Sequence, residues 1–513
     1  MDIQSGINIE EFLTPNKSMI IAPAGYGKTH TIVDCLEKFQ FEDKKILILT
    51  HTHAGIASIK TKIADGNIDS KIYEINTICS FTLNLTLAYV PESLLPDDSD
   101  MNKKYQKAQG FARQLLAAKP IKSVLQAKYA HIIVDEYQDC NTSQHQLIDL
   151  LGQFIKVHIL GDHMQGIFGF NGTPVDLNSS TFDDYRVHIQ TLNIPWRWNN
   201  AGAKELGEEI HKIRNLLEGQ QQIDLYQYKH IQFVKTQRND LYWHGKSKSD
   251  TPPEIITLLR HYLSDKHKGN VLIIHPLSFN KDSRVSLTKN LYNLGILESI
   301  DDSDFYDTVN EFENKSGNDL IASIKKFLQN TCAASVLSDW LHEDGSLVNV
   351  RKEGKLSTFM KIKGIVESLQ SQKSASLILS TISQLKQLLN IRVVRNDVYY
   401  TIQRVLIDAD RRNISLRESL KHNRDAVRRI GRSITGKYIG TTLLTKGLEC
   451  ETVIVLNAHQ FPDEKHLYVA LSRCSKKLIV ASESAILSPY HKSKEKAPAT
   501  DAIQLSLFSD LDY

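Results

Sequence analysis

One stretch near the start of the chain constrains the fold more than any other. An apolar run, Ser18-Met-Ile-Ile-Ala22, leads into a turn that contains Gly25 and Gly27, and an amphipathic segment follows from about His30 to Phe39. A glycine-rich turn between a buried strand and a helix lets successive backbone N–H groups point at one anion, and the helix N-terminus adds positive charge. The stretch therefore predicts a phosphate-binding loop.

The residues after the glycines suit a nucleoside triphosphate and its metal ion. Lys28 supplies a positive charge for the β- and γ-phosphates, and Thr29 supplies a hydroxyl for Mg²⁺. The match to G-x-x-x-x-G-K-[ST] is incomplete, because Ala22 stands in place of the first glycine. We expect ATP to contact the loop and the first turn of the helix, through Ala24, Gly25, Tyr26, Gly27, Lys28, Thr29 and His30.

Short apolar runs alternate with helical patterns through the first third of the chain. Such runs begin at Met19, Lys44, Ile72, Ala130 and Val157. Alternating buried strands and helices predict an α/β fold, with a parallel sheet wound by helices and ligands at the carboxyl ends of the strands. With 513 residues, 41% of them hydrophobic, the chain is long enough for several domains.

Charge and cysteine content exclude some classes of protein. The formal charge is only +3, from 62 basic and 59 acidic residues, so a nucleic-acid contact must use local basic surface. The 6 cysteines form no C-x-x-C pair, which argues against zinc, an iron–sulfur cluster or a disulfide framework and for a reducing compartment. No secretory signal or membrane-length apolar run is present, so we expect a cytoplasmic protein without a membrane partner.

An acidic pair, Asp135 and Glu136, follows the apolar run that opens at Ala130. Both carboxylates should emerge at the carboxyl edge of the sheet, beside the phosphate loop. There Asp135 would hold Mg²⁺ together with Thr29, and Glu136 would orient or deprotonate an attacking water. The alternative is a solvated acidic turn, but the phosphate loop upstream in the same sheet pattern favours the catalytic interpretation.

Three motifs occur in order, namely Ala22-x-x-Gly-x-Gly-Lys-Thr29, Asp135-Glu-Tyr-Gln-Asp139 and Gly161-Asp-His-Met-Gln165. Together they resemble the superfamily 1A helicases, the UvrD/Rep/PcrA group, and the resemblance runs from residue 18 to about residue 480. It implies two RecA-like parallel-sheet motor lobes with mainly helical inserted subdomains. It also implies that ATP and Mg²⁺ bind between the lobes, and that closure of the lobes drives 3′-to-5′ movement along single-stranded DNA.

The same resemblance implies roles for residues near the γ-phosphate and the nucleoside. Gln165 would report the state of the γ-phosphate. Arg197 and Arg473 would act as arginine fingers, because a guanidinium stabilises the charge that spreads over the transferring phosphoryl group. Trp196 would stack on adenine and Glu449, in Lys-Gly-Leu-Glu, would bind the ribose. For Arg197 the alternative is an arginine–tryptophan surface pair.

A second set of residues would contact DNA by resemblance. Thr52 and Thr77 match positions that touch the DNA backbone, and Thr442 lies in a loop, Thr441–Gly447, that would also touch DNA. Phe168 and Phe170 fall where the family has aromatic rings that stack on single-stranded bases, and such stacking tolerates any sequence. Ordinary core packing is the alternative for both rings.

The expected domain boundaries follow the motifs. We predict a first RecA-like lobe, a short helical insert, a second RecA-like lobe, a helical accessory insert and a flexible tail, at residues 1–80 with 129–195, 81–128, 196–296 with 433–487, 297–432 and 488–513. Compact UvrD-like chains of this size resemble the GajB-like helicase subunits of Gabija anti-phage defence systems, which work beside a separate nuclease. A partner nuclease is therefore predicted.

The tail ends in Gln504-Leu-Ser-Leu-Phe508, after a segment rich in lysine, serine and proline. This pentapeptide resembles the one that bacterial proteins use to dock on the replicative sliding clamp. Gln504, Leu505, Leu507 and Phe508 would then bind the clamp, and a flexible tether would raise the effective concentration of the motor at clamp-bound DNA. The alternative is that the apolar tail folds back on its own motor core.

Two functions remain open. The first is an ATP-dependent single-stranded DNA translocase or 3′-to-5′ DNA helicase that acts in DNA repair, replication or anti-phage defence. The alternative is a regulatory, DNA-sensing ATPase that gates a partner nuclease without processive unwinding. The predicted DNA-facing aromatics favour the motor, because a pure switch would not need them.

Overall fold

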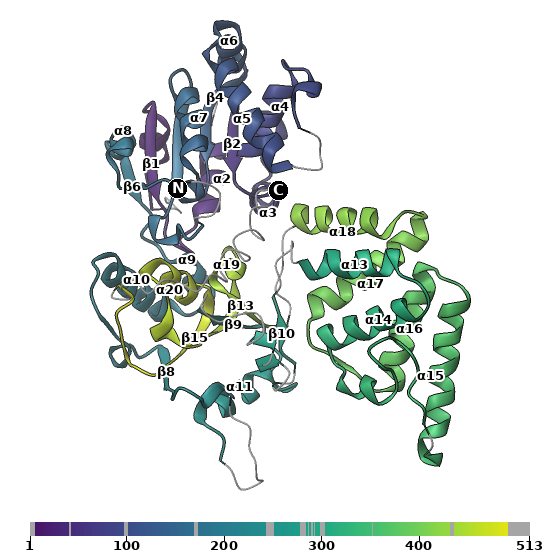
Figure 1. Cartoon of the computed structure of the whole chain (residues 1–513). Coiled ribbons are helices and arrows are strands. Elements are labelled where there is room, and N and C mark those ends of the chain that lie inside the picture. The colour runs from purple at the N-terminus through teal and green to yellow at the C-terminus, as the bar shows by residue number, and fades with distance from the viewer. Residues whose placement is uncertain are drawn as a thin grey trace. The chain divides into compact units, whose positions relative to one another are not determined.

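The computed structural model describes most of the chain (Figure 1). The described residues are 6–39, 43–96, 101–168, 173–242, 251–276, 284–285, 287–288, 291, 293–297, 303–350, 352–430 and 436–490. No helix among them is long and apolar enough to cross a membrane. All 6 cysteines lie in these ranges, and each is a buried free thiol.

The first sheet is parallel and six-stranded, with the order β3-β2-β4-β5-β1-β6. Its strands are β1 (Lys17–Ile21), β2 (Lys45–Thr50), β3 (Tyr73–Thr77), β4 (Tyr129–Val134), β5 (Lys156–Gly161) and β6 (Ile189–Thr191). The central strands are nearly continuous apolar runs because a parallel sheet is covered on both faces. The parallel α/β fold expected from the sequence is confirmed.

Helices follow the strands of this sheet in alternation. They are α1 (Ile9–Leu13), α2 (Lys28–Lys38), α3 (His53–Asp65), α4 (Ile78–Leu87), α5 (Met101–Ala117), α6 (Lys119–Lys128), α7 (Thr142–Gly152), α8 (Asp183–Arg186), α9 (Trp196–Asn200) and α10 (Lys204–Glu218). Several begin at a side-chain cap. Thr52 caps α3 and Thr77 caps α4, while Asn141 and Gln144 form a reciprocal capping box on α7. The threonine caps start α3 and α4 almost directly after β2 and β3.

The second sheet is also six-stranded, with the order β10-β13-β9-β14-β15-β8. Its strands are β8 (Ile231–Lys235), β9 (Val271–His275), β10 (Gly295–Ile296), β13 (Lys437–Thr441), β14 (Cys450–Val455) and β15 (Cys474–Ser482). The pairs β10–β13, β13–β9, β14–β15 and β15–β8 are all parallel. Two parallel sheets in one chain agree with the expected two RecA-like lobes.

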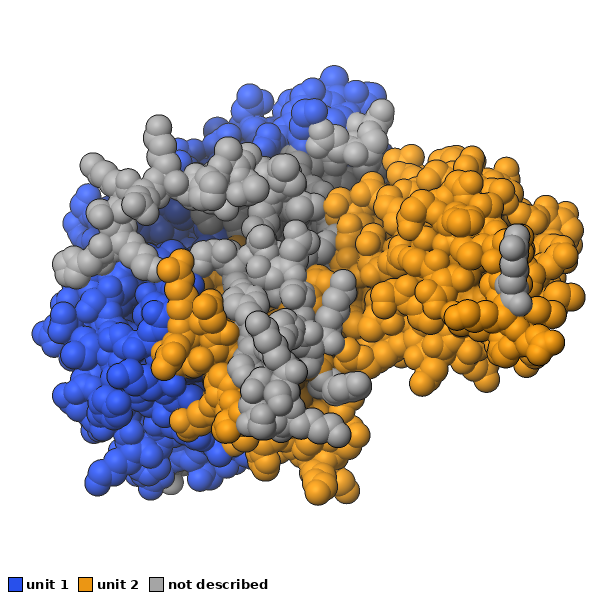
Figure 2. Space-filling model, turned by 60° about the horizontal axis from the view of Figure 1, so that its bottom comes forward, with its two compact units in different colours: residues 1–235, 428–433, 445–513 blue, residues 236–427, 434–444 orange. Residues whose placement is uncertain are grey.

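The chain divides into two compact units, coloured blue and orange in Figure 2. The first comprises residues 1–235, 428–433 and 445–513, and the second comprises residues 236–427 and 434–444. The first unit therefore contains every strand of the first sheet, together with α10, β14, β15 and α20 (Glu464–Leu471).

The second unit carries most of the helices of the chain's second half. They are α11 (Glu254–Leu263), α13 (Ser303–Asn314), α14 (Gly317–Thr331), α15 (Glu353–Ser371), α16 (Ala375–Leu388), α17 (Asn396–Arg412) and α18 (Leu416–Ile430). Aromatic rings fill the core of α13, α14 and α17. The ring centroids of Phe312 and Phe327 are 5.7 Å apart, and those of Phe327 and Tyr399 are 5.9 Å apart. This helical bundle is stabilised by apolar packing.

Candidate nucleotide-binding site

The phosphate loop joins β1 to α2 in the way the sequence predicts. Gly25 and Gly27 have φ values of +79° and +90°, a backbone region that glycine adopts without strain. Space is also limiting, because a Cβ on Gly25 would lie 2.8 Å from the Cβ of Arg197. A Cβ on Gly27 would lie 2.9 Å from Cδ1 of Trp196. Both glycines are thus required by conformation and by close approach.

Other loop residues are held by the helices around them. The Ala24 N–H donates to the hydroxyl of Tyr468 on α20 at 3.1 Å. Tyr26 is buried, and its hydroxyl lies 2.9 Å from Nδ1 of His211 on α10. Thr29 is half-buried and His30 is exposed, both in the first turn of α2. The predicted loop residues therefore lie together at the N-terminus of one helix.

Lys28 contacts both members of the acidic pair. Its Nζ lies 3.4 Å from Oδ1 of Asp135 and forms a second ion pair with Glu136. Burial lowers the pKa of Lys28, but the two carboxylates outweigh it and raise the pKa above its ordinary value. The lysine is therefore charged at neutral pH.

The two carboxyl groups differ in pKa. Burial raises the pKa of Asp135 to about 6 against the opposing charge of Lys28. Burial also acts on Glu136, but the charges of Lys28 and Lys446 outweigh it and lower its pKa to about 2. Glu136 also has a φ of +53°, a strained value for a residue with a side chain. Such strain is common at functional sites.

These residues fit Mg²⁺ and a nucleotide. The acidic pair already holds one cation, the ammonium of Lys28. Within the described part of the chain, no three His, Cys, Asp or Glu side chains gather at one metal position. Mg²⁺ typically takes one or two carboxylates and completes its shell with phosphate oxygens and water. Asp135 and Thr29 therefore stay the predicted protein ligands for a nucleotide-bound magnesium ion.

A chain of amide hydrogen bonds leads from Glu136 to the next strand. Gln138 donates to the carboxylate of Glu136, and its Oε1 accepts from the Asp162 N–H at 3.0 Å. The Asp162 carboxylate accepts from Nε2 of Gln165 at 3.0 Å. Nη2 of Arg473 donates to Oε1 of Gln165 at 3.3 Å. The structure thus brings together the predicted γ-phosphate sensor and one predicted arginine finger.

The second predicted finger, Arg197, lies in α9 against the phosphate loop. Its backbone N–H donates to the Gly25 carbonyl at 2.9 Å. Its guanidinium donates to the Ser472 carbonyl and pairs with Glu449. Burial acts to raise the pKa of Glu449, but Arg197 outweighs it and lowers the pKa. Arg197 and Glu449 are therefore neighbours, and their roles at the γ-phosphate and the ribose stay predictions.

Arg473 is buried, which is rare for an arginine. Its guanidinium donates to the Val469 carbonyl, the Gln165 amide oxygen and the Ser472 hydroxyl. Burial, and then the charge of Arg197, lower its pKa to about 10. At neutral pH it keeps its charge. Two guanidinium groups close together and beside the phosphate loop suit an anion of high charge, such as the β- and γ-phosphates.

Sequence reasoning missed the pair Lys446 and Asp139 as site residues. Nζ of Lys446 forms a buried ion pair with Asp139 and donates to the Gln165 carbonyl at 2.7 Å. It also lies 4.3 Å from the ring centroid of Phe168. Both charges lie inside motifs that the sequence displays, which is the signal that could have identified them.

The predicted DNA contacts are spread over several elements. Thr52 is exposed and its Oγ1 accepts from the Gly55 N–H at 3.0 Å, whereas Thr77 and Thr442 are buried. Phe168 is half-buried. Phe170 lies outside the described residues, and so do Gln504, Leu505, Leu507 and Phe508. The DNA and clamp contacts therefore stay predictions.

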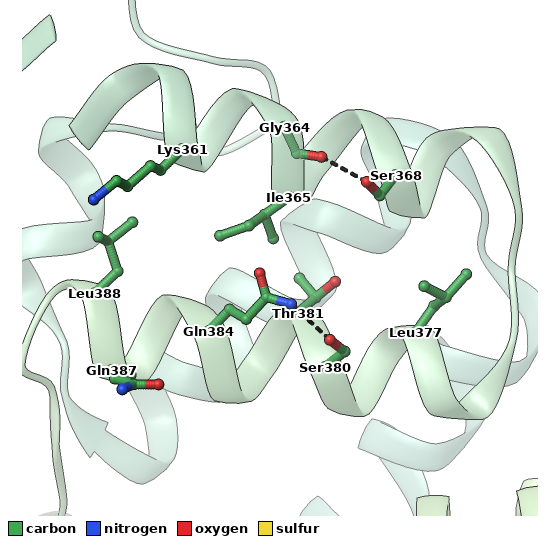
Figure 3. A pocket seen from close by; sticks show the side chains of 10 residues that line it. All are labelled: Lys361, Gly364, Ile365, Ser368, Leu377, Ser380, Thr381, Gln384, Gln387 and Leu388. Atoms are coloured by element: carbon green, nitrogen blue, oxygen red, sulfur yellow. Dashed lines mark hydrogen bonds between the residues drawn. The ribbon is translucent and has the colours of Figure 1, made fainter. Parts of the chain in front are cut away.

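A separate cavity of about 620 Å³ lies between α15 and α16 in the second unit (Figure 3). Serine, threonine and glutamine side chains line it together with Ile365, Leu377 and Leu388. Its single charged lining residue is Lys361, and it contains no carboxylate, histidine or cysteine. This cavity lacks the groups that phosphoryl transfer requires, so the candidate site is the phosphate loop and its neighbours.

The chain is similar to several known proteins. Residues 7–171 match a family model described as an AAA domain. The chain is 31% identical over 108 residues to a subunit of an ATP-dependent helicase/nuclease of Streptococcus uberis. The matched segment covers 21% of this chain and 8% of that protein. It is 46% identical over 93 residues to the ATP-dependent DNA helicase Rep of Salmonella typhimurium. This matched segment covers 18% of this chain and 13% of that protein.

A solved structure of the Pif1 helicase from Candida albicans is also similar, with 12% identity and a TM-score of 0.38. The alignment covers 95% of this chain and 97% of that one. The chain spans only 8% and 13% of the length of the two curated relatives named above.

Proposed function

We propose that this chain, which belongs to the UvrD/Rep/PcrA group of superfamily 1A, is an ATP-driven motor that moves 3′-to-5′ on single-stranded DNA and separates duplexes. The observation that carries the proposal is the convergence of Lys28, the acidic pair, Arg197 and Arg473 around one phosphate loop. These are the charges that phosphoryl transfer from ATP requires.

The hydrolytic step follows from the charges around the loop. Lys28 and the loop N–H groups bind the β- and γ-phosphates. Thr29 and Asp135 would hold Mg²⁺, which would neutralise charge on the phosphates. When Lys28 turns from the carboxylates to phosphate, Glu136 loses the charge that does most to lower its pKa. Its carboxylate then becomes a stronger base for the attacking water. Arg197 and Arg473 stabilise the charge that develops on the γ-phosphoryl group.

Coupling to DNA runs through the loop that carries Gln165 and Phe168. Lys446 contacts the carbonyl of the first and the ring of the second, and also pairs with Asp139 beside the acidic pair. A base that stacks on Phe168 would therefore disturb a cation tied to the hydrolytic carboxylates. The N-termini of α3 and α4, capped by Thr52 and Thr77, offer backbone N–H groups for DNA phosphates.

The biological setting is proposed more broadly. The Streptococcus uberis relative is named as a subunit of a helicase/nuclease, and this name supports the proposal that the motor works beside a partner nuclease. The pentapeptide Gln504–Phe508 supports docking on a bacterial sliding clamp. DNA repair, replication and anti-phage defence in the cytoplasm all suit such a motor.

Steady-state ATP hydrolysis tests the proposal. We expect strong stimulation of the wild type by single-stranded DNA and loss of that stimulation in Phe168→Ala. Strand displacement should occur on duplexes with a 3′ tail and not on duplexes with a 5′ tail. ATP hydrolysis that is indifferent to DNA would reject the motor and favour the regulatory ATPase.

A further inference from the structure

A buried arginine outside the predicted site residues reaches into the nucleotide-binding site. Arg214 lies on α10, on the same helical face as the buried Ile210, Ile213 and Leu217. Its side chain is only 7% exposed. Nη2 donates to Oδ1 of Asp162 at 2.9 Å, and Nη1 donates to Glu218 at 2.7 Å. An arginine on an apolar helix face, bridging two carboxylates, needs an explanation.

The aspartate that it holds organises the loop after β5. Asp162 is completely buried, and Oδ1 also accepts from the Met164 N–H at 3.1 Å. Its other oxygen, Oδ2, accepts from Nε2 of Gln165 at 3.0 Å. That bond fixes the orientation of the Gln165 amide, so Oε1 faces Nη2 of Arg473 at 3.3 Å. Arg214 is therefore two hydrogen bonds away from a predicted γ-phosphate sensor.

The same guanidinium also adjoins the phosphate loop. Its central carbon lies 5.8 Å from the ring centroid of Tyr468. The hydroxyl of that tyrosine accepts from the Ala24 N–H in the loop at 3.1 Å. Arg214 itself donates no hydrogen bond to the phosphate loop in these contacts, and its direct bonds go to Asp162 and Glu218.

Stability alone does not account for this arrangement. Removing two charges from water is costly, and apolar residues of similar volume often replace a buried ion pair with no loss of stability. Buried, hydrogen-bonded charges are worth more as devices that hold a reactive group in one geometry, because small displacements of such groups reduce rates strongly.

We propose that Arg214 is a positioning residue for ATP hydrolysis, which fixes Asp162 so that Gln165 presents its amide oxygen to Arg473. The inference rests on the proposed ATPase function. The guanidinium of Arg214 donates to Asp162 and Glu218, so Arg214 acts on the site through Asp162 and Gln165. Its loss should therefore lower kcat and leave the KM for ATP unchanged.

The experiment compares Arg214→Met and Arg214→Lys with the wild type at saturating single-stranded DNA. We expect kcat to fall about 10- to 100-fold in Arg214→Met, the range typical when a supporting residue is lost, with the KM for ATP within about twofold. Arg214→Lys should recover part of the rate, because an ammonium keeps the charge opposite Asp162 but cannot bridge both carboxylates. Melting temperatures of both variants report any general loss of stability.

A matched control and a coupling test separate positioning from a merely structural role. Arg186→Met also removes an arginine paired with an aspartate, Asp183, but on the more exposed helix α8, and should keep wild-type kcat. In the double variant Arg214→Met/Gln165→Ala, the loss of kcat should be smaller than the product of the two single losses. Residues that act as one unit give strongly non-additive losses of rate.

Three results would overturn the inference. They are wild-type kcat in Arg214→Met, a KM effect without a kcat effect, and full additivity with Gln165→Ala. A wild type that does not hydrolyse ATP would instead reject the proposed function, and this inference with it. If Arg214→Met does not fold, the kcat and the coupling of Arg214→Lys decide by the same criteria.

Discussion

The nucleotide-binding site and the helical bundle of the second unit pair their charges differently. The site contains ion pairs with both members buried, whereas in the bundle the buried Lys325, 2% exposed, pairs with Glu343, which is 85% exposed. In the site, Arg214 and Asp162 are 7% and 0% exposed and stand 52 residues apart in the chain, while Lys446 and Asp139 stand 307 apart. In the bundle, Lys363 pairs with Glu367 one turn later on α15, and the two side chains are 44% and 58% exposed.

The difference concerns what each region must do. The bundle is stabilised mainly by an apolar core that includes Phe312, Phe327 and Tyr399. Its buried Lys325 pairs with a carboxylate that stays largely in water. The site instead keeps several charges out of water and opposite one another, an arrangement that stores electrostatic energy for use on a ligand. Variants in the two regions should therefore behave differently.

The largest effect is expected from Glu136→Gln. The amide cannot deprotonate or orient water as a carboxylate does, so kcat for ATP should fall about 1,000-fold, within the usual range for a lost general base. Binding of the nucleotide should persist, as measured by the rise in melting temperature on adding Mg²⁺ and ATP. Hydrolysis within tenfold of the wild type would show that Glu136 is not the catalytic carboxylate.

The next effect concerns stability. Asp139→Ala leaves the ammonium of Lys446 buried without its partner carboxylate, and breaking a buried pair in this way lowers the free energy of unfolding by about 3–5 kcal/mol. Urea denaturation of the full chain measures the change. A loss below about 1 kcal/mol would mean that water reaches this pair, and the contrast with the bundle would weaken.

A smaller effect on stability is expected from a change of pH, because a row of buried side chains crosses β1, β5 and β4. Oγ of Ser18 lies 2.7 Å from Nδ1 of His158, and Nε2 of His158 lies 2.8 Å from Nδ1 of His131. Burial lowers the pKa of His131 to about 4 and lowers the pKa of His158 well below its ordinary value. Both histidines are therefore neutral in the folded protein.

The sign of the pH effect follows from these shifts. The unfolded histidines titrate near pH 6.5, so the folded state has its full stability above that pH and loses it as the pH falls toward 4. For His131 alone the loss between pH 7 and pH 5 is about 2 kcal/mol. Melting temperature followed against pH should show this slope, and His131→Gln should flatten it. An equal slope in that variant would place the titrating group elsewhere.

The smallest effect is expected in the bundle. Lys363→Ala removes a solvent-exposed pair on one helix, and exposed pairs of this spacing contribute about 0.3–0.5 kcal/mol. The free energy of unfolding should change by no more than that, and ATP hydrolysis should not change. A larger loss would show that charge matters in both regions, and the comparison would fail.

Much of the first sheet could be predicted from the chain alone. The apolar runs that begin at Met19, Lys44, Ala130 and Val157 correspond to β1, β2, β4 and β5, with ends that shift by a few residues. The phosphate loop and the acidic pair were also predicted, because local patterns of glycine, lysine and carboxylate reveal them. Pattern and spacing are sufficient when a feature lies within one strand, one turn and one helix.

The contacts of Arg214 with Asp162 and of Lys446 with Asp139 could not be predicted in the same way. Each joins residues from separate strands or helices, and no local pattern tells which carboxylate a buried cation will meet. The burial of Thr77 and Thr442 could not be predicted either, because both were predicted as DNA contacts by resemblance alone.

The amino-acid sequence by itself determined the α/β class, the phosphate loop and the chemistry of the acidic pair. Each depends on the backbone preferences and polarity of neighbouring residues. Only the tertiary structure decided which charges meet, as when Arg473 faces Gln165 across 308 positions of the chain. The reason is physical, since such a pairing becomes strong only after the chain has folded and has removed both charges from water.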